Sequence, residues 1–180
     1  MAGFAKVREE VIAHGFRFTV ARAWFRAADG TEFERHIVHH PGAVAILPLH
    51  DDDTITMVRQ FRAALDGDLL ELPAGLRDVD GEDDATTAAR ELIEETGLAA
   101  GRLEPLATFH NSPGYCDETV AVFLATELSE VDQDRQGIEE EAMVIERLPL
   151  AQVIAMADDG RITDAKTLIG LGALLRRRGG

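Results

Sequence analysis

Three glutamates, Glu91, Glu94 and Glu95, fall on one side of a predicted helix. Because a helix turns by about 100° per residue, Glu91 and Glu95 lie almost above one another and Glu94 lies roughly 60° to the side. Each like-charged pair at this spacing costs a helix roughly 0.2–0.5 kcal/mol. The cluster therefore favours a bound cation, and hard carboxylate oxygens suit Mg²⁺ or Mn²⁺ better than zinc.

The residues around these glutamates predict a rigid helix. Asp83 or Asp84 can cap its N-terminus, and Gly97 can end it in the left-handed conformation. A stripe at helical spacing should be buried, and it consists of Ala88, Ala89, Leu92, Ile93 and Thr96. For an isolated run of glutamates a solvated helix face is the more common interpretation. The caps and the buried stripe instead favour an acidic face that is held rigidly on a packed helix.

This segment resembles the Nudix hydrolase signature. Glu82 lies eight positions before Arg90, and the sequence RELIEETGL from Arg90 to Leu98 matches the second half of the signature at each fixed position. Six residues, rather than the usual five, separate Gly75 from Glu82, which we interpret as one additional loop residue. For Glu82 and Arg90, an ion pair between loop and helix is at least as good an interpretation as a direct metal role, and we prefer it for Arg90.

The resemblance implies an α/β fold, a Nudix α/β/α sandwich with a mixed sheet, and hydrolysis of a nucleoside diphosphate linked to another group. Three features narrow it to the ADP-ribose pyrophosphatase branch. They are the sequence ELPAG at 71–75, the sequence SPG at 112–114 with Pro113 fifteen residues after Leu98, and an N-terminal strand extension that ends in HPGAV at 40–44. The resemblance therefore implies conversion of ADP-ribose to AMP and ribose 5-phosphate.

The same resemblance implies the metal site. Glu91 and Glu95 are the principal predicted ligands, together with the backbone carbonyl of Ala74, and Glu94 shares the site. We expect two or more Mg²⁺ or Mn²⁺ ions, and we count Glu95 among the catalytic residues because its charge would hold an ion at the reacting phosphate.

The catalytic base is expected on a loop well after the signature. The acidic triplet 139–141 stands just before a predicted strand at 143–147, where that loop should lie. We favour Glu141 as base or metal ligand and place Glu139 second. A solvated acidic loop is the alternative.

Arginines should hold the diphosphate. The sequence RQFR at 59–62 resembles the RQ-aromatic-R segment of the family, and strand alternation places Arg59 and Arg62 on opposite faces. We favour Arg62. Arg35 is a candidate contact from a neighbouring subunit. The remaining candidates for substrate binding are Glu71, Pro113 and Gly114.

Composition limits the partners of the chain. A formal net charge of −15 opposes nonspecific binding to nucleic acid or to an anionic membrane, so we expect neither as a partner. The 180 residues, of which 46% are hydrophobic, suffice for one core and an extension. The single cysteine, Cys116, excludes an internal disulfide, and the charged N-terminal residues do not resemble a signal peptide. We expect a cytoplasmic protein.

The pattern along the chain predicts an extension at 1–42 and a Nudix domain at 43–180. The extension should contain strands at 16–27 and 32–40, joined by a turn at Asp29-Gly30. In the domain we expect a second hairpin from 43–49 and 54–60, strands at 103–110, 118–127 and 143–147, and helices at 150–158 and 164–178.

A two-stranded extension cannot form a core alone. Its alternating apolar residues therefore need a cover, and we expect a homodimer in which Arg35 reaches the partner's site. An extension folded back on its own domain is the alternative. Two rival functions also remain: hydrolysis of another nucleoside diphosphate sugar or an oxidised nucleotide, and a nucleotide-sensing module without catalysis.

Overall fold

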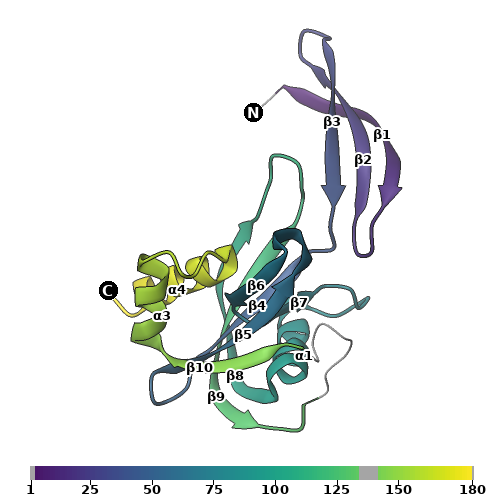
Figure 1. Ribbon diagram of the computed structural model, residues 1–180. Helices are drawn as coiled ribbons and strands as arrows, with labels where there is room; N and C mark the ends of the chain where they lie inside the picture. The colour runs from purple at the N-terminus through teal and green to yellow at the C-terminus, as the bar shows by residue number, and fades with distance from the viewer. Residues whose placement is uncertain (1–2, 134–141, 180) are drawn as a thin grey trace. The chain divides into compact units, whose positions relative to one another are not determined.

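The computed structural model describes residues 3–133 and 142–179 (Figure 1). The chain divides into two compact units. The first comprises residues 1–42 and 110–119, and the second comprises residues 43–109 and 120–180. Among the residues described, no helix is long and apolar enough to span a membrane.

The first unit contains an antiparallel sheet of three strands (Figure 1). These are β1 (Phe4–His14), β2 (Thr19–Ala27) and β3 (Glu32–His39), with β2 in the centre. The predicted turn between β2 and β3 is confirmed. Gly30 has φ of 89°, which favours glycine, and the Asp29 side chain accepts a hydrogen bond from the backbone N–H of Thr31 at 2.9 Å.

The expectation of a two-stranded extension was wrong, because β1 adds a third strand. Register shifts between Lys6 and Arg8 and between Val11 and Ala13 interrupt its pairing with β2. Each bulge moves the following side chains to the other face, so the sequence of β1 shows no continuous alternation. Exposed apolar and charged residues are therefore mixed along its whole length.

Residues 110–119 join this sheet at the edge formed by β3. The Val38 N–H donates to the Tyr115 carbonyl at 2.7 Å, and the Asp117 N–H donates to the Val38 carbonyl at 3.1 Å. Val38 and Cys116 form an isolated parallel bridge. The segment that carries Ser-Pro-Gly is thus fixed against β3 by backbone hydrogen bonds.

The second unit contains two sheets. The four-stranded sheet has the order β7-β4-β9-β8 and contains β7 (Ala74–Leu76), β4 (Ala43–Pro48), β9 (Thr119–Glu130) and β8 (Leu98–His110). The three-stranded sheet has the order β10-β5-β6 and contains β10 (Val144–Pro149), β5 (Thr54–Arg62) and β6 (Gly67–Glu71). The four-stranded sheet is mixed, because β4 is parallel to β9 and antiparallel to β7.

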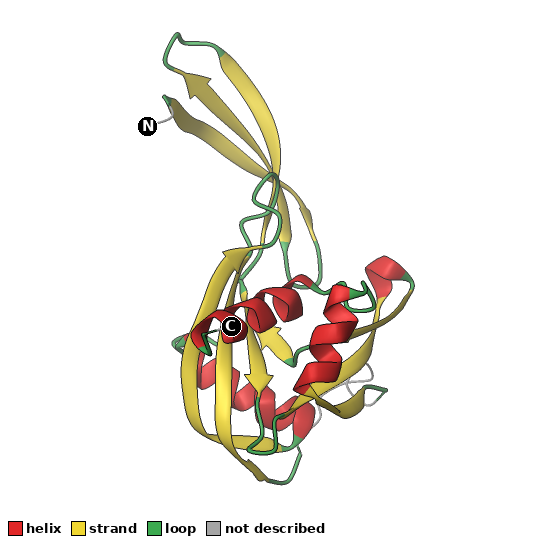
Figure 2. Cartoon of the chain, turned by 90° about the vertical axis from the view of Figure 1, so that its left-hand side faces the viewer, coloured by secondary structure: helices red, strands yellow, loops and turns green. Residues whose placement is uncertain are grey.

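Helices cover this unit from two sides (Figure 2). They are α1 (Asp84–Thr96), α3 (Leu150–Asp158) and α4 (Ala165–Arg177), and a short 3₁₀ turn, η1, spans Ala63–Leu65. Side chains alternate along β4: Val44 and Ile46 pack with Leu92 of α1, whereas Ala45 and Leu47 pack into the cluster that contains β5, α3 and α4. The predicted α/β/α sandwich with a mixed sheet is confirmed.

The predicted second hairpin was wrong in its pairing. The chain turns where expected, with Asp53 at φ of 61°, but only Leu49 and Ile55 form a bridge. Beyond that bridge, β4 and β5 enter different sheets. Both strands have buried side chains on both faces and need cover on both. β4 pairs with β9 instead of with β5, and the sequence around the turn does not indicate this pairing.

The short strands β6 and β7 were not predicted, and β8 begins at Leu98 rather than at 103. β6 ends at Glu71 and β7 begins at Ala74, so two residues connect the two sheets. Along this connection the Pro73 carbonyl accepts a hydrogen bond from the Ile46 N–H at 2.9 Å. The segment 71–74 is thereby held beside β4.

Candidate functional site

Helix α1 begins and ends as its sequence predicts. The Asp83 carboxylate accepts a hydrogen bond from the Thr86 N–H at 2.8 Å and caps the N-terminus. Gly97 ends the helix with φ of 68°, and its N–H donates to the Ile93 carbonyl at 2.9 Å. The glutamates between these caps therefore occupy fixed positions.

The buried face of α1 differs in part from the predicted stripe. Ala88, Leu92 and Thr96 are buried, whereas Ala89 and Ile93 are only partly buried. Two of the glutamates take part of the buried surface instead. The acidic face is consequently not a solvated one, because it lies against the rest of the second unit.

Glu91 lies against the backbone of β7 and is 8% exposed. A Cβ atom at Gly75 would overlap the Glu91 carboxyl group, so the glycine makes this approach possible. Burial raises the pKa of the Glu91 carboxyl to about 7; the charge of Glu94 acts in the same direction and Arg90 opposes it. Burial thus disfavours the charged form of this carboxyl group more than Arg90 favours it.

Glu95 and Ala74 are in direct contact. The Ala74 N–H donates to Glu95 Oε2 at 2.9 Å, and Glu95 is 5% exposed. Since Gly75 follows Ala74 and touches Glu91, the structure brings Glu91, Glu95 and the start of β7 together. These are residues that the sequence analysis named as metal ligands, and that role stays a prediction.

Arg90 connects the acidic residues around the helix. Its Nη1 lies 2.7 Å from Glu91 and 2.9 Å from Glu94, and its Nε lies 3.4 Å from Glu82. The ion pair between Glu82 and Arg90 is therefore present. Arg90 also places a positive charge beside two of the glutamates predicted to hold metal.

The chemistry of this face fits a divalent cation. Its donors are carboxylate oxygens, which hard cations prefer, and burial raises the pKa of the Glu91 carboxyl, an effect that a neighbouring cation would oppose. Within residues 3–133 and 142–179, no three His, Cys, Asp or Glu side chains converge as a metal centre. The individual ligands therefore stay predictions.

Arg62 forms a bidentate ion pair with Glu71. Its Nε and Nη2 donate to the two carboxylate oxygens at 2.7 and 2.8 Å. Lys166, at the start of α4, also contacts Glu71 Oε2. Burial alone would raise the pKa of Glu71, but the hydrogen bond from Arg62 and the charge of Lys166 outweigh it, so this pKa lies below its usual value. Lys166 was not predicted, although it is one of only two lysines in the sequence.

Arg59 has a different neighbour. Its Nε donates to Glu146 of β10 at 2.6 Å, while the intervening Gln60 is buried and Phe61 is exposed. The two arginines of this segment thus bind carboxylates on different strands. Of the two arginines, only Arg62 binds Glu71, the carboxylate that Lys166 of α4 also contacts.

Arg35, Pro113 and Gly114 lie in the first unit and line one cavity of about 420 Å³. The Arg35 guanidinium stacks over Phe33 with its carbon 4.7 Å from the ring centroid. Sequence reasoning did not associate the other lining residues with a site; they are Phe25, His36, Ile37, His110, Tyr115, Cys116 and Asp117. Tyr115, the only tyrosine of the chain, was the available signal.

His39 ties the same segment to the sheet. Its Nδ1 lies 2.5 Å from Asp117 Oδ2, and its Nε2 lies 3.1 Å from Glu9 Oε1 on β1. The hydrogen bond with Asp117 is the main cause that raises the pKa of His39, and Glu9 adds to it. A doubly protonated ring can donate to both carboxylates at once.

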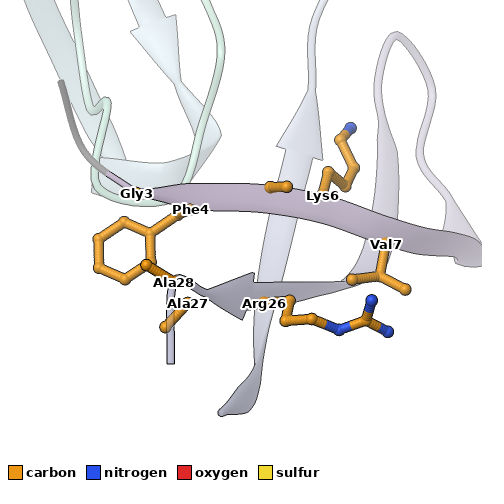
Figure 3. Close-up of a pocket in the computed structure, with 8 residues that line it drawn as sticks. Gly3, Phe4, Lys6, Val7, Arg26, Ala27 and Ala28 are labelled. Carbon is orange, nitrogen blue, oxygen red and sulfur yellow. The ribbon is translucent and has the colours of Figure 1, made fainter. Parts of the chain in front are cut away.

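A second hollow in the first unit carries little chemistry. It measures about 390 Å³ and is formed by the start of β1 and the end of β2, with residues that include Phe4, Lys6 and Arg26 (Figure 3). Lys6 pairs with Glu9, and Arg26 pairs with Glu32. Both cationic side chains that line this hollow therefore already form ion pairs with carboxylates.

The predicted base lies elsewhere in the chain. Glu139 and Glu141 fall outside the described residues, which stop at 133 and resume at 142. Their assignment remains a prediction.

Comparison with known proteins identifies the family. The profile of the NUDIX domain matches residues 39–169. The ADP-ribose pyrophosphatase of Bacillus subtilis (strain 168) is 42% identical over 139 residues, which cover 77% of this chain and 75% of that protein. The ADP-ribose pyrophosphatase of Mycobacterium tuberculosis (strain ATCC 25618 / H37Rv) is 38% identical over 168 residues, covering 93% and 81%.

A solved structure supports the fold. The crystal structure of an ADP compounds hydrolase matches with a TM-score of 0.82 at 24% identity, covering 98% of this chain and 96% of that chain. The signature on α1, the sandwich that carries it and the family match over most of the chain agree. The chain therefore belongs to the Nudix family.

Proposed function

We propose that this protein is a Nudix pyrophosphatase that hydrolyses ADP-ribose to AMP and ribose 5-phosphate. The observation that carries the proposal is the convergence of Glu91, Glu95 and the Ala74-Gly75 backbone on one buried acidic face. The substrate follows from the two relatives, each of which is named an ADP-ribose pyrophosphatase.

Nudix hydrolases generally need divalent metal ions. In this chain the proposed ligands of Mg²⁺, or alternatively Mn²⁺, are Glu91, Glu95, the Ala74 carbonyl and Glu94, with two or more ions per site. A bound divalent ion would supply a polarised phosphoryl oxygen and a more acidic water. The net charge of −15 gives such ions a second role, since they would offset repulsion of an anionic substrate.

The reaction consumes one water. Its oxygen forms a bond to one of the two phosphorus atoms, the bridging P–O bond breaks, and the released phosphate oxygen takes a proton. Glu141, or in second place Glu139, is the proposed base that accepts the proton of the attacking water.

Arg62 is the favoured contact to the diphosphate, with Arg59 as the alternative. The assignment of Arg62 is supported by its exposed side chain. It is also supported by the bidentate geometry of its guanidinium, which suits phosphate as well as carboxylate. Glu71 orients Arg62. Arg35, Pro113 and Gly114 are proposed to contact the nucleoside part, because they line one cavity together with aromatic side chains.

The proposed assembly is a homodimer in which Arg35 of one chain serves the site of the other. It is supported by exposed apolar side chains throughout the extension, namely Phe4, Val7, Val11, Ile12, Phe16 and Phe18. The proposed location is the cytoplasm, since Cys116 is a free thiol that suits a reducing compartment.

A substrate panel tests the function. Purified protein with Mg²⁺ is incubated with ADP-ribose, GDP-mannose and an oxidised nucleoside triphosphate, and the products are identified. ADP-ribose should have the highest kcat/KM and yield AMP with ribose 5-phosphate. Efficient turnover of either rival compound without turnover of ADP-ribose would reject the substrate assignment. Absence of any turnover would favour a sensing module.

A further inference from the structure

Four charged side chains meet where α4 begins beside the end of β6. Glu71, Asp164 and Lys166 are almost completely buried, whereas the Arg62 side chain is 42% exposed. Lys166 contacts both acids, with its Nζ 3.0 Å from Asp164 Oδ1. The group therefore contains two cations and two anions, and only Arg62 has substantial access to solvent.

The place of Lys166 in the helix is unfavourable in local terms. Asp164 caps α4, so Lys166 stands in the first turn, where the partial positive charge of the helix N-terminus repels cations. A helix would normally have an acidic or neutral residue there. The contact with Glu71 supplies a reason for a lysine at this position.

Glu71 has more positive charge than a simple ion pair needs. Its two oxygens are already bound by the fork of Arg62, and Lys166 adds a second cation. A buried carboxylate that lost its only cation would be strongly destabilised. With Lys166 in place, Glu71 has a second cation when Arg62 is shared with another anion.

We propose that Lys166 is a positioning residue for substrate binding: it holds the charge of Glu71, so that Arg62 can be shared with a phosphate of the substrate. Arg62 uses two of its five N–H groups on Glu71, which leaves donors for a phosphate oxygen. The inference rests on the proposed role of Arg62 in binding a nucleoside diphosphate.

The helix end is well fixed for this task. Asp164 accepts hydrogen bonds from the Thr167 N–H at 3.0 Å and the Thr167 hydroxyl at 2.6 Å. The Thr167 hydroxyl oxygen in turn accepts from the Leu72 N–H at 2.9 Å. The backbone next to Glu71 is thus held by the same turn that carries Lys166, which fixes the distance between the two charges.

Steady-state kinetics of Lys166→Met test the proposal. The substrate is any nucleoside diphosphate sugar that the wild type hydrolyses, so the test survives if ADP-ribose is the wrong choice. KM should rise at least tenfold while kcat changes less than about threefold, because Arg62 is then retained by Glu71. Lys166→Arg should restore most of the affinity. The matched control is Arg161→Met, which removes an exposed ion pair with Asp159 just before α4 and should leave KM unchanged.

The same substitution in a Glu71→Gln variant distinguishes a positioning role of Lys166 from a purely structural role. Glu71→Gln removes the buried charge that Lys166 is proposed to hold, so adding Lys166→Met to it should change KM less than about twofold. This double variant also keeps the test valid if Lys166→Met alone does not fold. An equal rise of KM in both backgrounds, or a loss of kcat with unchanged KM, would overturn the proposal.

Discussion

Gly75 is the residue on which the position of Glu91 depends most directly. A side chain at Gly75 would enter the space of the Glu91 carboxyl group, and that group is fixed by a capped helix. Gly75→Ala should therefore displace the acidic face and lower kcat at least about tenfold, a barrier increase of about 1.4 kcal/mol. Circular dichroism should show that the fold is kept.

Gly172→Ala is the matched control for this prediction. Gly172 lies on α4, and an added Cβ would only meet the end of the Arg176 side chain at an ordinary 3.4 Å. Alanine in a helix is favoured over glycine, so this variant should be fully active and slightly more stable. Equal activity of Gly75→Ala and Gly172→Ala would show that the approach of Glu91 to β7 is unimportant.

The hydrogen bonds of His39 make the stability of the first unit depend on pH. Because the pKa of His39 is raised, the stability that His39 contributes is fully present below the ordinary pKa of 6.5. This stability is lost as the pH rises through the raised pKa. For Asp117, burial opposes ionisation, but the hydrogen bond with His39 lowers the pKa. The stability that Asp117 contributes is therefore lost as the pH falls below the ordinary pKa of 3.8.

Thermal unfolding checks this prediction with His39→Gln. The variant should have a lower Tm than the wild type at about pH 5.5, and the difference should shrink at pH 9. His14→Gln, at the exposed end of β1, serves as the control and should follow the wild type at both values. A Tm difference that grows toward high pH would contradict the assignment.

Local signals made α1 predictable. Asp83, Gly97 and the spacing of the three glutamates are all contained in one short segment, and the structure has the helix between the same caps. The pairing of β4 with β9 could not be found in this way, because residues 43–48 meet residues 120–125 across a long stretch of chain. A turn between two apolar strands predicts a hairpin unless a distant strand competes for the same edge.

The same limit applies to the site. Glu91 and Glu95 were predicted from the signature and Ala74 from the sequence ELPAG; the structure brings the three residues together, and their roles as metal ligands stay predictions. Lys166 lies 95 residues from Glu71, and no local pattern connects them. Tyr115 lines the cavity of Arg35 only because residues 110–119 pair with β3, which is again a contact between distant segments.

Assembly is the prediction that concerns the chain as a whole. The exposed apolar residues of the extension should be covered by a second copy, so light scattering at micromolar concentration should give about twice the chain mass of 19.6 kDa. A mass near 19.6 kDa would exclude the dimer. If the protein is dimeric, mixing Arg35→Ala with Glu95→Gln chains should restore part of the activity, whereas self-contained sites would stay inactive.

The acidic face of α1 is proposed to drive hydrolysis of ADP-ribose. The most direct test of this proposal is the rate of AMP formation from ADP-ribose with saturating Mg²⁺, measured for the wild type and for Glu95→Gln. The substitution keeps the size of the side chain and removes its charge. The wild type should release AMP with ribose 5-phosphate, and Glu95→Gln should be slower by at least about 10²-fold, a barrier increase of about 2.7 kcal/mol, with the fold retained. Near-normal AMP release by Glu95→Gln would contradict the account.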